Sequence, residues 1–325
     1  MKVERDFKMK IDKRLVLNRK LFNHRLKFLS LYFSHLLNRR YLNIYIDSSI
    51  EHSQKDLIAN KKFIDNDDCS FNEGDLQRMA KCIFKNATKI QMGYSLEPTN
   101  YPLLTKIVTL GKQFGVPHIA LRTEAVAPNI KNLEALLQAG LDEFIVPCKS
   151  FMHSADHLKY KKLLSIFSQL RADYNFRVKF KFNFNEHNIN ELQYLFRYFE
   201  TDSFDILQLS PEKLNSLSEK SDHSLENLNE DYQYNLLKIK AACIRSNIHV
   251  IAPNNLVNFY RDTILKTVFD YTFCYISPSK FWKDDFNWRD ESFTAYSKRI
   301  AWRKTLLSNA LISQSYFKLF LPEID

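Results

Sequence analysis

Residues 117–147, PHIALRTEAVAPNIKNLEALLQAGLDEFIVP, contain the pattern that decides the fold. The short apolar run Pro117–Arg122 predicts a strand, and the leucine spacing over Asn129–Gln138 predicts an amphipathic helix. Gly140 is suited to the C-cap of that helix, because glycine tolerates the left-handed conformation found there. Glu143–Pro147 predicts a second strand. A strand, a helix and a strand in this order pair in parallel through a right-handed crossover.

The same alternation extends in both directions along the chain. Further strands are predicted at Tyr41–Ile46, Thr88–Tyr94, Phe176–Phe184, Phe204–Leu209 and Ile248–Ala252, and further helices at Glu73–Lys85, Tyr101–Phe114, His153–Ala172, Ile189–Phe199 and Glu230–Arg245. The polar stretch 211–229 predicts a long loop. Because single helices separate the strands, we predict an α/β fold, a partial (βα)6 TIM-like barrel.

Composition excludes several classes of protein. The formal charge of the 325 residues is +10, but residues 1–40 hold twelve Lys or Arg against three acids, so the rest of the chain is almost neutral. This distribution argues against a general nucleic-acid-binding surface. The five glycines are too scattered to form a phosphate-binding loop. No apolar run approaches the ~18 residues of a spanning helix, and the five scattered cysteines suit a reducing compartment, so we expect a cytoplasmic protein.

The two ends of the chain differ from its middle. Residues 1–40 predict a basic amphipathic helix, with apolar positions at Leu15, Phe22, Leu26, Leu29, Phe33 and Leu36. We favour a helix that closes one side of the fold, and the alternative is binding to a membrane surface or an acidic partner. Residues 41–252 would form the barrel, and 253–325 a mainly helical C-terminal extension. Its stretch Phe281–Arg289 is rich in aromatic and basic residues, as protein interfaces are.

Three passages resemble the radical SAM superfamily. Gln91–Pro98, after the second strand, is similar to the GGEP segment of that family. Lys112–Thr123 resembles its third strand, and Ala139–Val146 resembles the "aGld" step of its fourth. The resemblance covers about residues 41–210 and implies a partial (βα)6 barrel that binds a [4Fe-4S] cluster and S-adenosylmethionine.

The chain departs from that family at the cofactor site. The family carries CxxxCxxC after the first strand, because the cluster needs three neighbouring thiolates. The corresponding loop here, residues 47–57, contains no cysteine. We therefore expect no iron–sulfur cluster, and S-adenosylmethionine, if it still binds, would contact Gly93 and Glu97.

The combination resembles the cluster-lacking, pseudo-radical SAM proteins of peptide natural-product pathways. It implies a non-catalytic partner or substrate-binding subunit in the modification of ribosomal peptides. The implied partners are a true radical SAM maturase, a precursor peptide or both. The sequence leaves open whether the chain forms a homo-oligomer.

A second hypothesis is a barrel enzyme that uses another cofactor or none. The C-terminal ends of barrel strands line the functional mouth. The predicted strand ends place five candidate pocket residues there: Glu97, Arg122, Glu124, Cys148 and Lys149. The carboxylates, lysine and arginine could serve as acid, base or anion-holding groups. A polar ring that is merely solvated explains the same pattern.

The predicted strand Phe176–Phe184 alternates phenylalanine or valine with polar residues. Parallel strands buried on both faces do not alternate in this way, so one face of this strand is expected to be polar. Its polar residues are Arg177, Lys179, Lys181 and Asn183, which we expect to point into the barrel and to bind an acidic peptide or a carboxylate. The alternative is an edge strand that its lysines protect from aggregation.

Overall fold

The structure is a computed structural model. It describes residues 40, 42–47, 70–93, 97–124, 129–152, 154–212, 222–253, 255–256, 273–278 and 286–300. The chain divides into two compact units, residues 1–41 and 42–325, and all described residues except Arg40 belong to the second. The predicted N-terminal helix therefore lies outside the described residues, as do the cysteine-free loop beyond Asp47 and the end of the chain from residue 301.

The core of the second unit is one parallel sheet. Its strands are β1 (Leu42–Ile46), β2 (Ala87–Met92), β3 (His118–Arg122), β4 (Glu143–Cys148), β5 (Arg177–Phe184), β6 (Ile206–Pro211), β7 (His249–Ile251) and β8 (Phe273–Ile276). The strand order is β7-β6-β5-β4-β3-β2-β1-β8, and every neighbouring pair is parallel. Within the described ranges no pairing joins β7 to β8, so the sheet is open.

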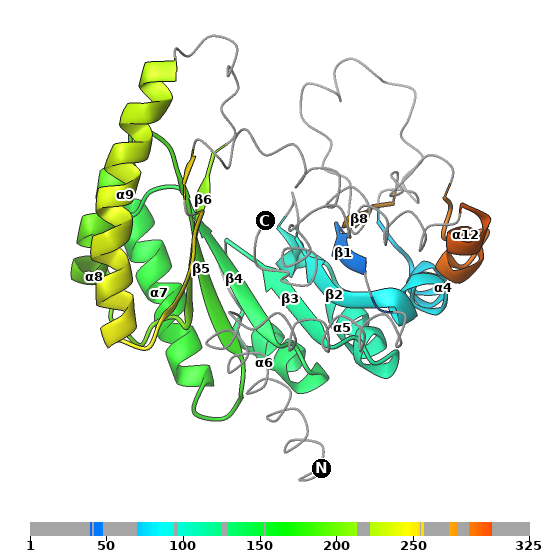
Figure 1. Cartoon of the computed structure of the whole chain (residues 1–325). Helices are drawn as coiled ribbons and strands as arrows, with labels where there is room; N and C mark the ends of the chain where they lie inside the picture. The colour runs from blue at the N-terminus through cyan, green and yellow to red at the C-terminus, as the bar shows by residue number, and fades with distance from the viewer. Residues whose placement is uncertain are drawn as a thin grey trace, which may run out of the picture. The chain divides into compact units, whose positions relative to one another are not determined.

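Helices lie along one face of this curved sheet (Figure 1). They are α4 (Glu73–Ile83), α5 (Leu104–Gln113), α6 (Ile130–Ala139), α7 (Ser154–Leu170), α8 (Leu195–Tyr198), α9 (Asp222–Arg245) and α12 (Phe293–Arg299), with short 3-10 turns η1 (Phe84–Asn86), η2 (Pro98–Asn100) and η3 (Ile189–Tyr194). The predicted α/β architecture is therefore confirmed. No helix in the described part of the chain is long and apolar enough to cross a bilayer.

Local sequence explains where these helices begin and end. Asn72 and Asp75 form a reciprocal capping box at the start of α4. The Asn129 side chain accepts a hydrogen bond from the Lys131 amide at the start of α6. Gly140 ends α6 at φ +104°, which confirms the predicted C-cap.

The face of β4 and β5 that meets the helices is a stack of aromatic rings. Phe144 packs against Phe167 of α7 at 4.5 Å between ring centroids and against Phe176 at 5.4 Å. Farther along, Phe184 of β5 stacks on Tyr232 of α9 at 5.1 Å. Such pairs add about 0.5–1.5 kcal/mol each beyond the burial of their surface. The phenylalanines of the alternating strand are therefore its core side, and the strand is central in the sheet, between β4 and β6.

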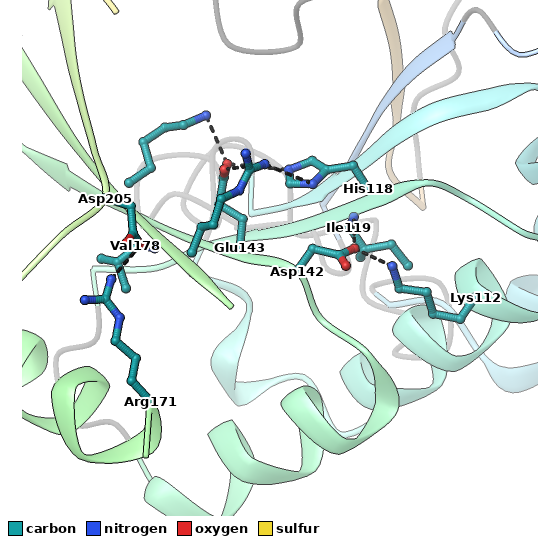
Figure 2. A network of polar contacts seen from close by, with 10 residues as sticks. Lys112, His118, Ile119, Asp142, Glu143, Arg171, Val178 and Asp205 are labelled. Carbon is teal, nitrogen blue, oxygen red and sulfur yellow. Dashed lines mark hydrogen bonds and ion pairs between the residues drawn. The ribbon is translucent and has the colours of Figure 1, made fainter. Parts of the chain in front are cut away.

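Two aspartates fasten the N-terminal edge of the sheet (Figure 2). Asp142, before β4, accepts a hydrogen bond from the Ile119 amide at 2.8 Å and pairs with Lys112 at the end of α5. Asp205, before β6, accepts one from the Val178 amide at 2.7 Å and pairs with Arg171, just beyond α7, at 2.6 Å. Each aspartate thus joins the end of a helix to the start of a neighbouring strand.

Four segments differ from the prediction. The helix predicted at Ile189–Phe199 is the 3-10 turn η3 followed by the four-residue helix α8. Helix α9 begins at Asp222 and not near Glu230, because Leu228 is already buried one turn before Tyr232. Strand β8 was not predicted: it lies beside β1, inside the segment interpreted as a mainly helical extension. In the stretch predicted as an interface, Trp288 is buried, and its ring centroid lies 6.0 Å from that of Phe71. Trp288 therefore belongs to the core.

Candidate functional site

The polar face of the sheet carries a buried cluster of charges. Glu143, at the start of β4, is fully buried; its carboxylate lies 3.0 Å from the Lys179 ammonium and 3.2 Å from the Arg177 guanidinium, both on β5. On the other side, His118 of β3 lies 3.6 Å from the same carboxylate, and Figure 2 shows the two side chains pointing toward one another. The register of β4 and β5, with Glu143 opposite Arg177, brings these groups together.

These contacts set the ionisation of the cluster. Burial alone would raise the pKa of Glu143, but Lys179, His118 and Arg177 outweigh it and hold that pKa well below its ordinary value. For His118 burial dominates and lowers its pKa, although Glu143 opposes the shift. At neutral pH the cluster therefore contains a carboxylate and a neutral imidazole.

A further buried lysine makes the cluster basic. Lys89 of β2 is opposite His118 in the sheet register and is 1% exposed. Burial holds its pKa well below the ordinary value, and the positive charge of Lys179 adds to the shift. Glu143 opposes this shift, so Lys89 responds to the same carboxylate that Arg177 and Lys179 contact.

Lys181 extends the basic row toward the C-terminal edge of the sheet. It is partly buried between Pro147 of β4 and Gln208 of β6 in the register. Burial lowers the pKa of Lys181 to about 8, and the nearby charges of Lys179 and Arg122 contribute. Arg122 of β3 and Lys179 of β5 are both opposite Ile145 of β4 in the sheet register. They therefore lie at the same height in the sheet, two strands apart. Arg122 and Lys179 thus flank Ile145 on this face, and Lys181 lies beside the next residue of that face, Pro147, so the three cationic side chains form an arrangement suited to an anion.

The carboxylate of Glu97 holds two loops together at the C-terminal edge. One of its oxygens accepts hydrogen bonds from the hydroxyls of Thr99 and Thr123, each at 2.7 Å, and from the Thr99 amide at 3.3 Å. Its other oxygen accepts one from the Glu124 amide at 2.7 Å. Glu97 is therefore engaged by the protein itself, and these contacts give it a positioning role.

Gly93 makes the close approach of β2 and β3 feasible at this edge. Its φ is +78°, and a Cβ at this position would lie 2.5 Å from the carbonyl oxygen of Arg122. The Gly93 amide donates to the Ile46 carbonyl at 3.0 Å, and its own carbonyl accepts a bond from the Arg122 guanidinium at 3.4 Å. Both backbone groups of Gly93 are thus used within the sheet.

Arg122 and Glu124 form part of the rim. Their side chains are 3.4 Å apart, and Lys159 of α7 lies 3.7 Å from the Glu124 carboxylate. Because the Glu124 side chain is 49% exposed, these pairs contribute little to stability. The structure therefore brings together four of the predicted residues at one edge: Gly93, Glu97, Arg122 and Glu124.

The other predicted residues lie elsewhere. Cys148 is fully buried. It lies two residues after Val146 and four after Phe144, so its side chain is on the same helix-facing side of β4. Lys149 is exposed beyond the strand end. Asn183 is partly buried on the polar side of β5, and its carbonyl accepts a bond from the Asn188 side chain at 3.1 Å. Cys148 thus does not share the polar face with Lys181, and Lys149 lies outside the strand.

The cysteines that the structure describes do not lie together as a three-thiolate site. Cys82, Cys148, Cys243 and Cys274 lie on α4, β4, α9 and β8, which are separate parts of the fold. Burial raises the pKa of Cys243 to about 12 and also raises that of Cys274, which disfavours the thiolate needed as a ligand. Within the described ranges no group of three or more His, Cys, Asp or Glu is placed to hold a metal ion. Nor does Gly93 leave an amide for the cofactor that the GGEP-like segment implies.

Comparison with known proteins gives a likeness of fold. No protein-family model matches the chain, and no curated protein matches it. The solved structure of native anSMEcpe with bound AdoMet and Cp18Cys peptide is 12% identical, with a TM-score of 0.50 over 82% of this chain and 83% of that one. SuiB of Streptococcus suis bound to S-adenosylmethionine is 11% identical, with a TM-score of 0.47 over 85% and 70%. SuiB bound to precursor peptide SuiA is 12% identical, with a TM-score of 0.43 over 78% and 62%.

Sequence reasoning did not find the acid at the centre of the basic cluster. Glu143 was interpreted only as the first residue of a strand, and His118 as part of another. The available signal was a single carboxylate at the start of the otherwise apolar run Glu143–Pro147. A charge in such a strand requires a buried partner, and Lys179 supplies it.

Proposed function

We propose that this chain is a non-catalytic, radical-SAM-like protein that binds a peptide. It would act as a partner of a radical SAM maturase, or as a substrate-holding subunit, in the modification of ribosomal peptides. The observation that carries the proposal is the basic polar face made by Arg122, Lys179 and Lys181 beside a single buried carboxylate. The sequence resemblance and the likeness of fold to an anSMEcpe structure that holds a peptide support it.

The geometry of the basic face suits an extended acidic segment. Neighbouring strands lie about 4.8 Å apart, so Arg122 and Lys179, two strands apart, are separated by roughly 10 Å at their backbones. Carboxylates on alternate residues of an extended chain are about 7 Å apart, which long side chains can bridge. Bringing a carboxylate beside Lys181 also opposes the burial and the positive charges that lower the pKa of this lysine.

Two observations support a binding role without radical chemistry. The described cysteines lie on separate elements, and the loop that carries the cluster motif in the resembled family has no cysteine. Glu97 and Gly93, the residues expected to contact S-adenosylmethionine, are engaged by protein groups. We therefore expect isothermal titration with S-adenosylmethionine to give no binding heat.

Binding of a labelled acidic peptide to the full chain tests the substrate class. We expect fluorescence anisotropy to detect binding of a Glu-rich peptide and not of the same peptide with glutamine at each glutamate. Lys181→Gln and Arg122→Gln should each weaken binding about tenfold or more, since each removes a charge from the site. Lys131→Gln, on the exposed start of α6, removes an equal charge and should change nothing. Equal binding of both peptides would refute an anion site.

The partner is tested separately. The chain would be isolated from its own cells under gentle conditions, and the bound components identified by mass spectrometry. We expect a radical SAM protein with an intact cysteine motif, or a small precursor peptide, in stoichiometric amount. Isolation of the chain alone with a small molecule would refute the partner role and direct attention to the strand-end residues as an active site.

A further inference from the structure

Helix α9 carries a row of apolar residues on the side that faces away from the sheet. Tyr234, Leu237 and Ile244 are 59%, 71% and 77% exposed, and Ala241 between them is also exposed. The opposite side of the helix lies against η3 and β7, and its five buried apolar residues are Leu228, Tyr232, Leu236, Ile239 and Cys243. In Figure 1 α9 lies at the outer margin of the helical layer. The helix is thus apolar on two sides, of which the fold covers one.

The spacing of this row is that of a coiled-coil seam. Tyr234, Leu237, Ala241 and Ile244 follow one another at intervals of three, four and three residues, the a and d positions of a heptad. We call these four residues the α9 seam. Two copies packed antiparallel about a two-fold axis level with residue 239 place Tyr234 opposite Ile244 of the second copy. The same axis places Leu237 opposite Ala241, so the seam is complementary to itself.

Charges beside the seam favour this antiparallel arrangement. Asp231 and Arg245 lie on the same flank at opposite ends of the seam. In an antiparallel pair Asp231 of each copy lies near Arg245 of the other, and the two Lys238 side chains meet near the two-fold axis. A parallel pair has no such attraction and places Lys240 of each copy against Arg245 of the other. Between Asp231 and Arg245, Lys238 lies over the Tyr234 ring, 3.9 Å from its centroid.

We propose that the chain forms a two-fold symmetric dimer in which the α9 seams of two copies pack antiparallel. The dimer uses the helical face and not the basic face, so it is independent of peptide binding. A single pair of helices of this length lies near the ~1,000 Å² lower bound of specific interfaces. We therefore expect a dissociation constant in the micromolar range.

Sedimentation velocity of the full chain over roughly 1–200 µM, a range that brackets this affinity, tests the dimer. We expect a concentration-dependent shift from monomer to dimer. Leu237→Glu and Ile244→Glu should each raise the dissociation constant about thirtyfold or more, because charges enter the centre of the interface. Leu158→Glu, at a residue of α7 that is 64% exposed, is the matched control and should have no effect. Melting temperatures equal to that of the parent protein would show that the variants fold.

A charge exchange tests the orientation. Asp231→Arg and Arg245→Asp should each weaken the dimer about fivefold, and the double variant should restore it, since only antiparallel packing brings these residues together. A monomer throughout the concentration range would overturn the proposal. So would a dimer that is insensitive to Leu237→Glu and Ile244→Glu, or a double variant that is weaker than either single one.

Discussion

The buried carboxylate of Glu143 gives a sharp quantitative prediction. The variant Glu143→Gln keeps the size of the side chain and removes its charge. Lys179, 1% exposed and 3.0 Å from this carboxylate, would then remain buried without its counter-charge. Removing one partner of a buried pair costs about 3–5 kcal/mol. We expect the free energy of unfolding to fall by that amount, which corresponds to roughly 4–8 °C in melting temperature for a chain of this length.

The loss of unfolding free energy in Glu143→Gln has a defined pH dependence. The pKa of Glu143 in the folded chain is held well below its ordinary value, which is about 4.3 in an unfolded chain. A lowered folded pKa means that the stabilisation is present above about pH 4.3 and is lost as the pH falls through the folded pKa. The difference between parent and variant should therefore stay constant from about pH 6 to 8 and shrink below about pH 4.

Urea unfolding followed by tryptophan fluorescence and circular dichroism measures this difference. Glu200→Gln, at an exposed glutamate, is the charge-matched control and should change the free energy of unfolding by less than about 0.5 kcal/mol. The double variant Glu143→Gln with Lys179→Met should recover most of the loss, because it leaves no unpaired charge between these two positions. An effect of Glu143→Gln below about 1 kcal/mol at pH 7 would refute the reasoning, since Lys179 would then have reached water.

Three further predictions concern the same sheet. The folded pKa of Lys181 is about 8, below its ordinary ~10.4, so the unfolded chain binds more protons between these values. Urea unfolding should show stability rising more steeply over this interval in the parent than in Lys181→Gln, in which only Lys89, whose pKa is also lowered, still contributes. Asp205→Asn should lower the free energy of unfolding by about 1–3 kcal/mol, since it weakens the bonds from the Val178 amide and Arg171; an unchanged urea midpoint would contradict the fastening role. Gly93→Ala should lower it by at least about 1–3 kcal/mol in thermal melts, because φ is +78° and the new Cβ meets the Arg122 carbonyl; the control Gly74→Ala introduces a methyl at an ordinary φ.

The alternation of strands and helices could be predicted because each element carries its own local pattern. Gly140 marked the end of α6 at the residue where the structure has it, and the phenylalanines of β5 marked its core side. Strand β8 could not be identified in the same way. Its four residues, Phe273–Ile276, are a short apolar run in an aromatic segment, and they form a strand through pairing with β1, more than 200 residues away.

The candidate site was predicted in part for the same reason. The basic residues of β5 alternate within one strand, so Lys181 and its neighbours were visible in the sequence. Glu143 meets Arg177 and Lys179 only through the register of β4 on β5, and register is a property of the pairing and not of either strand. In the same way, Glu97 was predicted as a pocket residue, but its hydrogen bonds to Thr123 and Glu124 come from a loop that its own sequence does not specify.

Asp142 and Asp205 have a consequence for how such a chain can change over generations. Both fasten the N-terminal edge of the sheet, whereas the residues that would meet a ligand in a barrel of this kind lie at the opposite edge. Selection for folding therefore acts mainly on one rim, and selection for recognition on the other. Loops at the ligand-facing rim that lie outside the contacts of Gly93 and Glu97 can be exchanged with little loss of stability. Asp142 and Asp205 can therefore stay unchanged while the chemistry at the opposite edge of the sheet changes.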